Sequence, residues 1–379
     1  MIFFDHNATT TPWPAAADAA AAWLRAGPAN ASSVHAAGRR ARAAIEAARR
    51  QVAQALGATA ADLVFTSGAT EALHLAILGR VPAGGHVVAS AVEHPAVFGA
   101  CAVAGARVTR VPVDGEGRLA VADVLAAIEP RTALVAVMAA QNEIGTIFPV
   151  ADIARAVAPV PVLCDAVQAW GKVPLDVRAL GCALAVVSGH KIGAPSGVGV
   201  LWAPRALALR PTLAGGPQER GRRAGTENLP AIVGLGVAAT EAVAASLTAT
   251  HAVAARRARL RAALTTLPGL RFHGAAGGPA DMLPNTLAFR VDGLPGDELL
   301  QALDLEGICL SSGSACAAGA LEPSSVLRAL GLATEEARGG LRLSLGRDNT
   351  DAEVERFIDV FPRLVARARA ARAEGRACA

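Results

Sequence analysis

Residues 160–191 read VPVLCDAVQAWGKVPLDVRALGCALAVVSGHK. This stretch holds two apolar runs that each end in polar side chains, the first at Asp165 and the second at Ser188, His190 and Lys191. Short runs that are apolar throughout are typical of strands buried on both faces of a parallel sheet. Ligands of such sheets collect at the carboxyl ends of the strands, so we expect a functional site where these two runs end.

Similar apolar runs alternate with helical segments on both sides of this stretch. We predict strands at 63–66, 86–90, 107–111, 133–138, 160–165, 184–188 and 198–202, and helices at 70–78, 95–104, 121–128 and 152–157. This alternation predicts an α/β fold with a mostly parallel sheet and helices on both of its faces.

The pattern changes after residue 225. A long helix rich in Ala, Val and Arg is predicted at 229–264, shorter segments follow at 283–290, 295–306, 308–311, 324–330 and 341–345, and a final helix begins at about residue 350. We therefore predict a large α/β domain of residues 10–250 and a small α+β domain of residues 1–9 and 251–379.

The composition excludes several classes of protein. Of 379 residues, 53% are hydrophobic and 18% are charged, so the chain can bury a large core and is not expected to be disordered. The net charge of +4 and the 3% of aromatic residues argue against a nucleic-acid partner. We also expect neither a membrane span nor a secretory signal. The six cysteines lack the paired spacing of a zinc site or a disulfide framework, which favours the cytoplasm.

Lysine is rare in this chain. Of the 36 basic residues, only Lys172 and Lys191 are lysines. An arginine stays protonated, whereas a lysine amine can lose its proton and form a Schiff base, so such chemistry would fall to one of these two residues. A general bias of composition toward arginine also explains the count. Lys191 is the stronger candidate because it follows a strand beside Ser188 and His190, whereas Lys172 follows a turn and is expected to make a structural contact.

Two further signals are ambiguous when each is taken alone. Residues 66–71, TSGATE, lie between a predicted strand and a predicted helix, where free amides form either a phosphate-binding turn or a purely structural helix cap. Asp165 ends an apolar strand and needs a partner there, which a protonated ring nitrogen or the amides of a helix start would supply.

Together these stretches resemble pyridoxal 5'-phosphate enzymes of the class V aminotransferase family, and further motifs narrow the resemblance to cysteine desulfurases of the NifS/IscS type. The motifs span nearly the whole chain: DHNATT (5–10), VEHP (92–95), NEIG (142–145), SGHK (188–191), QERGRRAGTEN (218–228), and SSGSAC (311–316) followed by LEPS (321–324). The resemblance implies the type I fold of the pyridoxal phosphate transferases. The chain departs from the family at Ser196, where lysine is common, and at Pro217, where histidine is common, which bears on substrate entry and partner choice.

The resemblance also implies a role for each matching residue. Lys191 forms the covalent link to the cofactor, Asp165 lies against its pyridine nitrogen, and Gln168 bonds its phenolic oxygen. His94 stacks on the ring and is an acid–base candidate, while Cys316 is the nucleophile that takes the sulfur. The other matching residues hold the phosphate (Ala69, Thr70, Ser188, His190 and, from a neighbouring subunit, Thr226) or the substrate (Arg342 and Asn142, the latter also near the ring oxygen).

The implied reaction converts L-cysteine to L-alanine and leaves a persulfide on Cys316 for transfer to an iron–sulfur scaffold or another acceptor protein. A homodimer with shared sites is implied as well, with no stable metal site, although Cys316 could serve as a transient iron–sulfur ligand. Three alternatives stay open: a selenocysteine lyase, a class V transaminase, and a catalytically silent scaffold for sulfur transfer. The small side chains after Cys316 further predict that residues 312–321 are poorly ordered without a partner.

Overall fold

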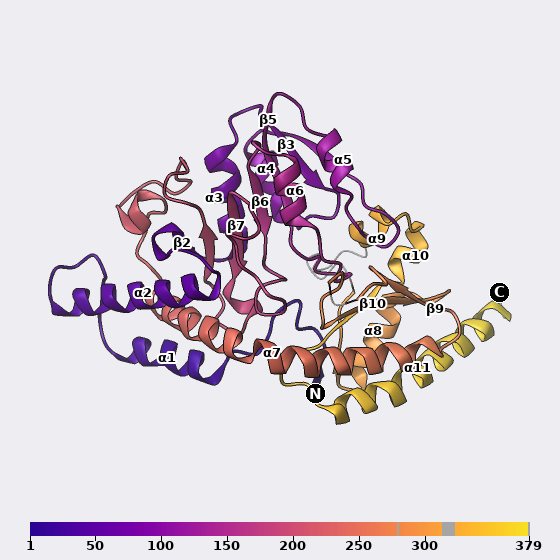
Figure 1. Ribbon diagram of the computed structural model, residues 1–379. Helices are drawn as coiled ribbons and strands as arrows, with labels where there is room; N and C mark the ends of the chain where they lie inside the picture. Colours follow the sequence, from indigo (N-terminus) through magenta and orange to yellow (C-terminus); the bar gives the residue numbers. More distant parts are fainter. Residues whose placement is uncertain (279, 313–322, 378–379) are drawn as a thin grey trace.

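The computed structural model describes residues 1–278, 280–312 and 323–377, and its main sheet occupies the upper part of Figure 1. Within the described residues this sheet has seven strands in the order β2-β8-β7-β6-β5-β3-β4. They are β2 (Leu63–Thr66), β3 (His86–Ser90), β4 (Arg107–Val111), β5 (Thr132–Met138), β6 (Val162–Asp165), β7 (Leu184–Ser188) and β8 (Gly199–Trp202). β8 runs antiparallel to both of its neighbours, and the other strands of this sheet share one direction. The predicted α/β fold with a mostly parallel sheet is confirmed.

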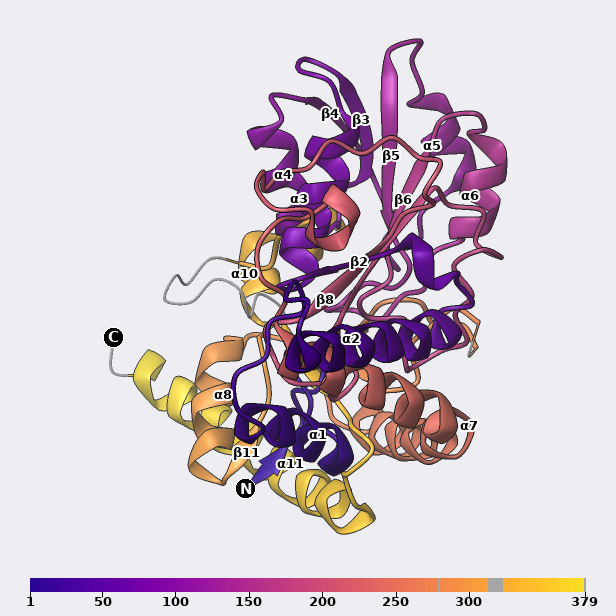
Figure 2. The same cartoon turned by 90° about the vertical axis from the view of Figure 1, so that its left-hand side faces the viewer.

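Helices cover both faces of the main sheet (Figure 2). One face carries α3 (Ala69–Arg80) and α4 (Pro95–Val103), and the other carries α2 (Ala36–Ala55), α5 (Val121–Ala126) and α6 (Val150–Ala156). Within β5, Leu134 and Ala136 pack into the cluster under α3 and α4, whereas Val135 and Val137 pack into the opposite cluster. Because successive side chains of a strand point to opposite faces, a sheet covered on both sides requires strands that are apolar throughout.

The long helix α7 (Leu229–Thr265) connects the main sheet to the C-terminal elements. Its first half packs against α1 (Pro14–Arg25) and α2, and α11 (Asp351–Ala377) runs beside its second half (Figure 1). The C-terminal sheet is antiparallel, in the order β12-β10-β9, and shares a hydrophobic cluster with α8 and α11. The strands of this sheet are β9 (Leu270–His273), β10 (Thr286–Val291) and β12 (Leu341–Ser344). The helices in this part of the chain are α8 (Gly296–Leu305), α9 (Ser325–Ala329) and α10 (Thr334–Arg338).

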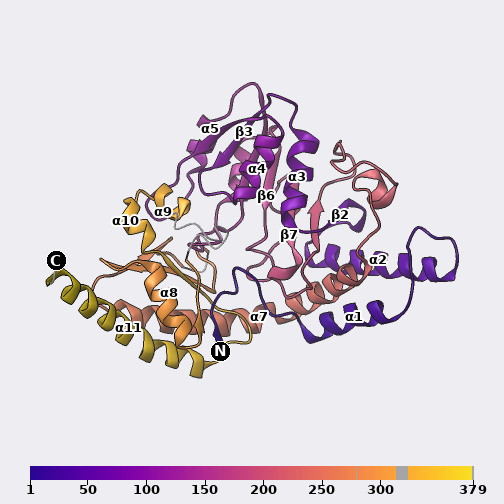
Figure 3. The same ribbon diagram turned by 180° about the vertical axis from the view of Figure 1, so that it is seen from behind.

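The N-terminal segment packs with these C-terminal elements. β1 (Ile2–Phe3) pairs in parallel with β11 (Ile308–Cys309), and Figure 3 shows the N-terminus beside α8 and α11. Phe4 is completely buried, with its ring centroid 5.9 Å from that of Phe357 in α11. The residues after Phe4 therefore run from the C-terminal sheet toward the main sheet. The limits of the two domains stay a prediction.

Several predicted elements differ from the observed ones at their ends. β6 begins at Val162 rather than at residue 160, β10 begins at Thr286 rather than at 283, and β11 ends at Cys309 rather than at 311. α1 and α2 come from residues 14–55, for which the patterns above predict no element. Among the described residues no single helix has both the length and the hydropathy to cross a membrane. The two parts of α7, Leu229–Ala245 and Thr250–Thr265, meet those criteria only as a pair bent by 69°.

Candidate active site

Neighbouring strands of the main sheet deliver most of the predicted site residues to one edge. β6 ends at Asp165, and β7 ends at Ser188, directly before the 3-10 turn that carries Lys191. β3 leads to His94, which caps α4 by accepting a hydrogen bond on Nδ1 from a first-turn amide. This is the carboxyl edge at which a site was predicted.

The backbone of the N-terminal segment meets this edge at Asn7, whose residue surface is 1% exposed. Its carbonyl oxygen accepts hydrogen bonds from Lys191 Nζ at 2.5 Å and from Gln168 Nε2 at 3.0 Å. Lys191 Nζ also donates to the carbonyl oxygen of Ala8 at 2.7 Å. The amine of Lys191 is therefore held by main-chain oxygens of a segment that lies far from it in the sequence.

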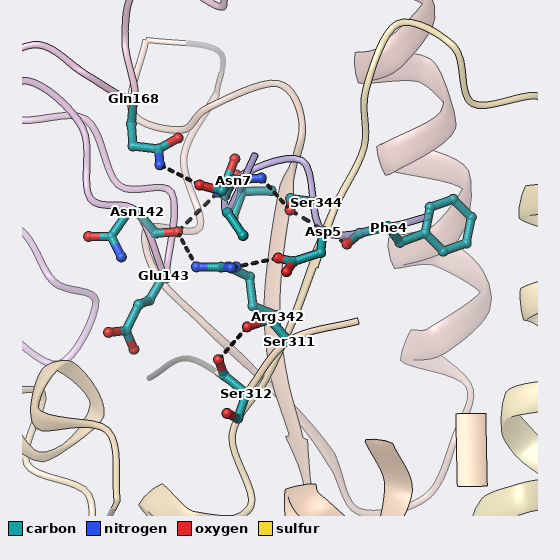
Figure 4. A network of polar contacts seen from close by, with 12 residues as sticks. Phe4, Asp5, Asn7, Asn142, Glu143, Gln168, Ser311, Ser312, Arg342 and Ser344 are labelled. Atoms are coloured by element: carbon teal, nitrogen blue, oxygen red, sulfur yellow. Dashed lines mark hydrogen bonds and ion pairs between the residues drawn. The ribbon is translucent and has the colours of Figure 1, made fainter. Parts of the chain in front are cut away.

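The side chain of Asn7 ties this segment to the C-terminal sheet (Figure 4). Its Nδ2 donates to the carbonyl oxygen of Asn142 at 3.0 Å and to Thr286 Oγ1 at 2.9 Å, and its Oδ1 accepts from Asn285 Nδ2 at 3.0 Å. Its amide donates to Ser344 Oγ at 2.9 Å. Every polar group of Asn7 thus has a partner, as burial at this depth requires.

Lys172 belongs to the same network. Its Nζ donates to Asn7 Oδ1 at 2.8 Å and to Gln168 Oε1. Burial first, and then the positive charges of Lys191 and Arg342, lower the pKa of Lys172 well below its usual value. The structural contact expected of this lysine exists, but one of its partners is Asn7, which also holds Lys191, and the other, Gln168, donates to the same Asn7 carbonyl.

Arg342 lies in the middle of β12 with its side chain 2% exposed. Nη2 donates to Asp5 Oδ1 at 2.6 Å, and Nη1 donates to the carbonyl oxygen of Asn142 at 3.2 Å, the same oxygen that Asn7 uses (Figure 4). Its Nε is buried and has no hydrogen-bond partner among the described residues. The predicted substrate residues Arg342 and Asn142 are therefore in contact, and the Nε–H of the guanidinium has no acceptor among the described residues.

Two buried acids lie beneath this edge. Asp165 Oδ1 accepts a hydrogen bond from Val167 N at 3.0 Å, and burial raises the pKa of Asp165. Burial likewise raises the pKa of Glu93 to about 8, although its Oε1 accepts from Ser90 Oγ at 2.6 Å and from Met138 N at 2.9 Å. Glu93 Oε2 has no hydrogen-bond partner among the described residues. A protonated Glu93 is the expected form at neutral pH, since burial disfavours the carboxylate.

Glu143 is a third buried acid, on the other side of Asn142. Burial raises its pKa to about 7, against the opposing effects of a hydrogen bond from Ser324 and of the charges of Arg342 and His94. The Ser324 hydroxyl donates to Glu143 Oε2 at 2.6 Å and caps α9. Before the segment 313–322, Ser311 exchanges main-chain hydrogen bonds with Arg342 of β12. The described residues on both sides of 313–322 therefore lie at the site.

The turn between β2 and α3 has the geometry of an anion-binding turn. The first intrahelical hydrogen bond runs from Ala72 N to Gly68 O at 3.1 Å, so the amides of Ala69 and Thr70 precede it. A Cβ at Gly199 of β8 would lie 2.5 Å from the carbonyl carbon of Gly68, so only glycine allows this close approach. Ser67 N donates to Glu71 Oε2 at 2.7 Å, which also fits a structural helix cap, so the phosphate-binding role of this turn stays a prediction.

His190 lies beside Lys191 on the same turn. Its Nδ1 is 3.2 Å from Thr9 Oγ1, and burial followed by the charge of Lys191 lowers the pKa of His190 to about 4. The ring is consequently neutral at physiological pH and can take part in hydrogen bonds as a donor on one nitrogen and an acceptor on the other.

Ion pairs of Glu219, Arg220, Arg223 and Glu227 hold the loop with the QERGRRAGTEN motif, while Thr226 within it is exposed. Glu219 pairs with Arg49, and both side chains are 2% exposed. Arg223 donates from Nε and Nη2 to Glu71 at 2.7 and 3.1 Å, which anchors the loop to the first turn of α3. Among the described residues, no hydrogen bond or ion pair joins Thr226 to the residues at the edge that carries Lys191, so its phosphate-binding role stays a prediction.

Cys316 lies outside the described residues, as does most of the segment 312–321. Among the described residues there is no group of three or more His, Cys, Asp or Glu side chains arranged to hold a metal ion. Sequence reasoning assigned no role to Asn7, Asp5 or Glu143, although all three stand in motifs quoted above. Their position inside those motifs was the available signal.

A partly buried lysine at the carboxyl edge of a mostly parallel sheet, next to a buried carboxylate and a helix-start turn, defines a lysine-centred α/β enzyme. The chain belongs to the aminotransferase class-V family, whose sequence profile matches residues 2–357.

Individual relatives agree with this assignment. A cysteine desulfurase of Gluconacetobacter diazotrophicus is 43% identical over 378 residues, which cover 97% of this chain and 94% of the relative. A solved NifS-like protein from Rickettsia africae superposes with a TM-score of 0.89 at 30% identity, covering 97% of this chain and 99% of that one. Another solved relative, SspA in complex with cysteine, gives a TM-score of 0.78 at 31% identity over 92% of this chain and 100% of that one.

Proposed function

We propose that the protein is a pyridoxal 5'-phosphate-dependent cysteine desulfurase that converts L-cysteine to L-alanine and leaves a persulfide on Cys316. The observation that carries this proposal is the network through Asn7, which joins the amine of Lys191 to the guanidinium of Arg342 by way of the Asn142 carbonyl. A relative 43% identical over nearly the whole chain is a cysteine desulfurase.

The residues at the edge of the sheet fit the cofactor. The buried carboxyl of Asp165 would gain a charged partner in a protonated pyridine nitrogen, and the amides before Ala72 would bind the phosphate together with Ser188 and His190. Lys191 would hold the aldehyde carbon, and Gln168 would donate to the phenolic oxygen. When bound, pyridoxal phosphate supplies an electron sink for the charge that develops at the substrate α-carbon.

The substrate carboxylate would bind to Arg342. A guanidinium fork can take both carboxylate oxygens, which a lysine ammonium cannot do. The Nε of Arg342 is without a partner among the described residues, and its Nη2 would exchange Asp5 for the substrate. Asp5 and the Asn142 carbonyl therefore hold the guanidinium in place before substrate arrives. With cofactor and substrate bound, Lys191 would move protons at the α-carbon, and His94 would be a second acid–base group.

The sulfur step would fall to Cys316. Its thiolate forms an S–S bond with the substrate sulfur, the substrate C–S bond breaks, and the electron pair stays on the carbon, which takes a proton to become the methyl group of alanine. The persulfide then passes to an acceptor thiol. A free thiol with a pKa near 8.5 is mostly protonated at neutral pH, so the reaction needs a local base.

The assembly belongs to the same proposal. Thr226 is exposed, whereas the neighbouring Glu227 side chain is 3% exposed, forms an ion pair with Arg42 at 3.7 Å and has no hydrogen-bond partner for either oxygen among the described residues. These features support a homodimer in which Thr226 reaches the phosphate of the other subunit. We also propose an iron–sulfur scaffold or another sulfur acceptor as the partner protein. The cytoplasm is the proposed location, because the cysteines lack disulfide spacing.

The test supplies L-cysteine with a reductant and measures sulfide and alanine together, which desulfuration must produce in equal amounts. Cys316→Ala should keep the cofactor absorbance but lose persulfide and sulfide. Lys191→Ala should lose the cofactor that borohydride otherwise fixes to the chain. Sulfide release by Cys316→Ala at the wild-type rate would favour a lyase without a cysteine nucleophile, and the same assay with selenocysteine would then decide its substrate.

A further inference from the structure

Lys172 contacts the side-chain oxygens of both Gln168 and Asn7, and its Nζ carries N–H groups that can donate to them whether the amine is charged or neutral. Its Nζ donates to Gln168 Oε1 and to Asn7 Oδ1, the second contact at 2.8 Å. A side-chain amide has one end that accepts and one end that donates. A donor placed on the oxygen therefore decides where the NH2 group of that amide points.

For Gln168 this decision has a direct consequence at the site. With Oε1 facing Lys172, Nε2 faces the Asn7 carbonyl at 3.0 Å, the same oxygen that receives Lys191 Nζ at 2.5 Å. The NH2 group of Gln168 is thereby presented beside the amine of Lys191. With the amide turned over, the Asn7 carbonyl oxygen would face Gln168 Oε1, which is a repulsive contact, and the N–H groups of Lys172 would lose the Gln168 acceptor.

Asn7 is fixed in the same way. Lys172 Nζ and Asn285 Nδ2 both donate to Asn7 Oδ1, at 2.8 and 3.0 Å, so Nδ2 must point to the Asn142 carbonyl and to Thr286. The Asn142 carbonyl in turn receives Arg342. Lys172 thus helps to orient two side-chain amides, of which Gln168 lies toward Lys191 and Asn7 is connected to Arg342 through the Asn142 carbonyl.

We propose that Lys172 is a positioning residue: by donating to Gln168 Oε1 and Asn7 Oδ1, it orients the Gln168 NH2 group as the hydrogen-bond donor to the cofactor oxygen next to Lys191. This inference rests on the proposed cofactor. The titratable and charged groups around Lys172 are Lys191, Arg342 and His6. They favour the neutral amine, and a neutral amine still carries N–H donors for both contacts.

The experiment compares the holoenzymes of wild type, Lys172→Met and Lys172→Arg. Cofactor absorbance is recorded against pH to find the midpoint at which the link to Lys191 loses its proton. Lys172→Met removes the donor, so the cofactor oxygen loses its hydrogen bond and becomes more basic, and the midpoint should rise by about one pH unit. Lys172→Arg retains a donor at this position and should restore most of the wild-type midpoint. Retention of cofactor after dialysis is the second readout.

A third variant tests whether the effect passes through Gln168. Gln168→Ala should raise the midpoint by a similar amount with Lys172 intact, so the proposal stays testable if Lys172→Met fails to fold. Adding Lys172→Met to Gln168→Ala should then shift the midpoint by less than the sum of the single shifts. Wild type without a cofactor band would overturn the proposed function and this inference with it. A normal band with unchanged midpoints in Lys172→Met or Gln168→Ala would overturn the inference alone.

Discussion

Glu219→Ala should destabilise the protein far more than its place in a loop suggests. Glu219 accepts hydrogen bonds from Arg49 Nη1 at 2.8 Å, from Arg49 Nη2 at 2.6 Å and from Phe65 N at 2.8 Å. Removing one partner of a buried ion pair leaves an uncompensated charge and costs about 3–5 kcal/mol. Arg49 would retain Glu46 at 3.2 Å and the Leu63 carbonyl at 3.0 Å. We therefore expect a loss of unfolding free energy near the lower end, about 3 kcal/mol.

The measurement is urea unfolding at 25 °C, followed by circular dichroism. Asp152→Ala is the matched control, because it removes an ion pair with Arg155 whose side chains are 60% and 77% exposed. Such an exposed pair should contribute less than about 0.5 kcal/mol.

A double variant identifies the source of the cost. Arg49→Met combined with Glu219→Leu removes both charges, so it should recover most of the stability that Glu219→Ala loses. If Glu219→Ala cost less than about 1 kcal/mol, the reasoning from a stranded buried charge would be refuted. If the double variant were no more stable than the single one, packing in the loop would be the cause instead.

Three further predictions concern the site. The pKa of Glu93 is raised from 4.5 to about 8, so between these pH values the native state binds a proton that the unfolded state does not, and the protein loses stability as the pH rises through this range. The unfolding free energy of Glu93→Gln should therefore exceed that of wild type at pH 9 and match it near pH 4. Gly199→Ala should weaken cofactor binding roughly tenfold or more in an absorbance titration, since its Cβ would meet Gly68, whereas the control Gly99→Ala has open space and should bind normally. Arg342→Lys should raise the KM for L-cysteine about ten- to a hundredfold, and an unchanged KM would place the substrate carboxylate elsewhere.

The main sheet could be predicted from the sequence because its signals are local. The observed bounds of β2, β3, β4 and β7 are the predicted ones, because each strand is an uninterrupted run of strand-forming residues between turn residues. α2 carried a usable signal as well: its buried residues Ala41, Ile45, Ala48 and Val52 repeat at helical spacing, hidden in a stretch where alanine is frequent.

The site was predictable only in part. Lys191, Asp165 and Arg342 stand in recognisable motifs, and the structure brings them to the same edge or into one hydrogen-bond network. The partners of Asn7 lie between 135 and 337 residues away, and the Arg49–Glu219 pair spans 170 residues. Pairings over such distances are set by how the elements pack, so no local pattern reveals them. The same limit explains why Lys172 could be recognised as a lysine of interest but not as a neighbour of Lys191.

The contacts of Asn7 also fix an order of events during synthesis of the chain. β3 and β4 pair within about 25 residues of each other, so this part of the sheet can form soon after it is made. Asn7, by contrast, donates to Ser344, which is made 337 residues later. An incomplete chain can therefore build the sheet and expose Lys191, yet it cannot close the network around that amine before β12 emerges. Tight cofactor capture should consequently mark a finished chain, and a ribosome-bound chain that stops short of residue 344 should carry the fold of the sheet without a closed site.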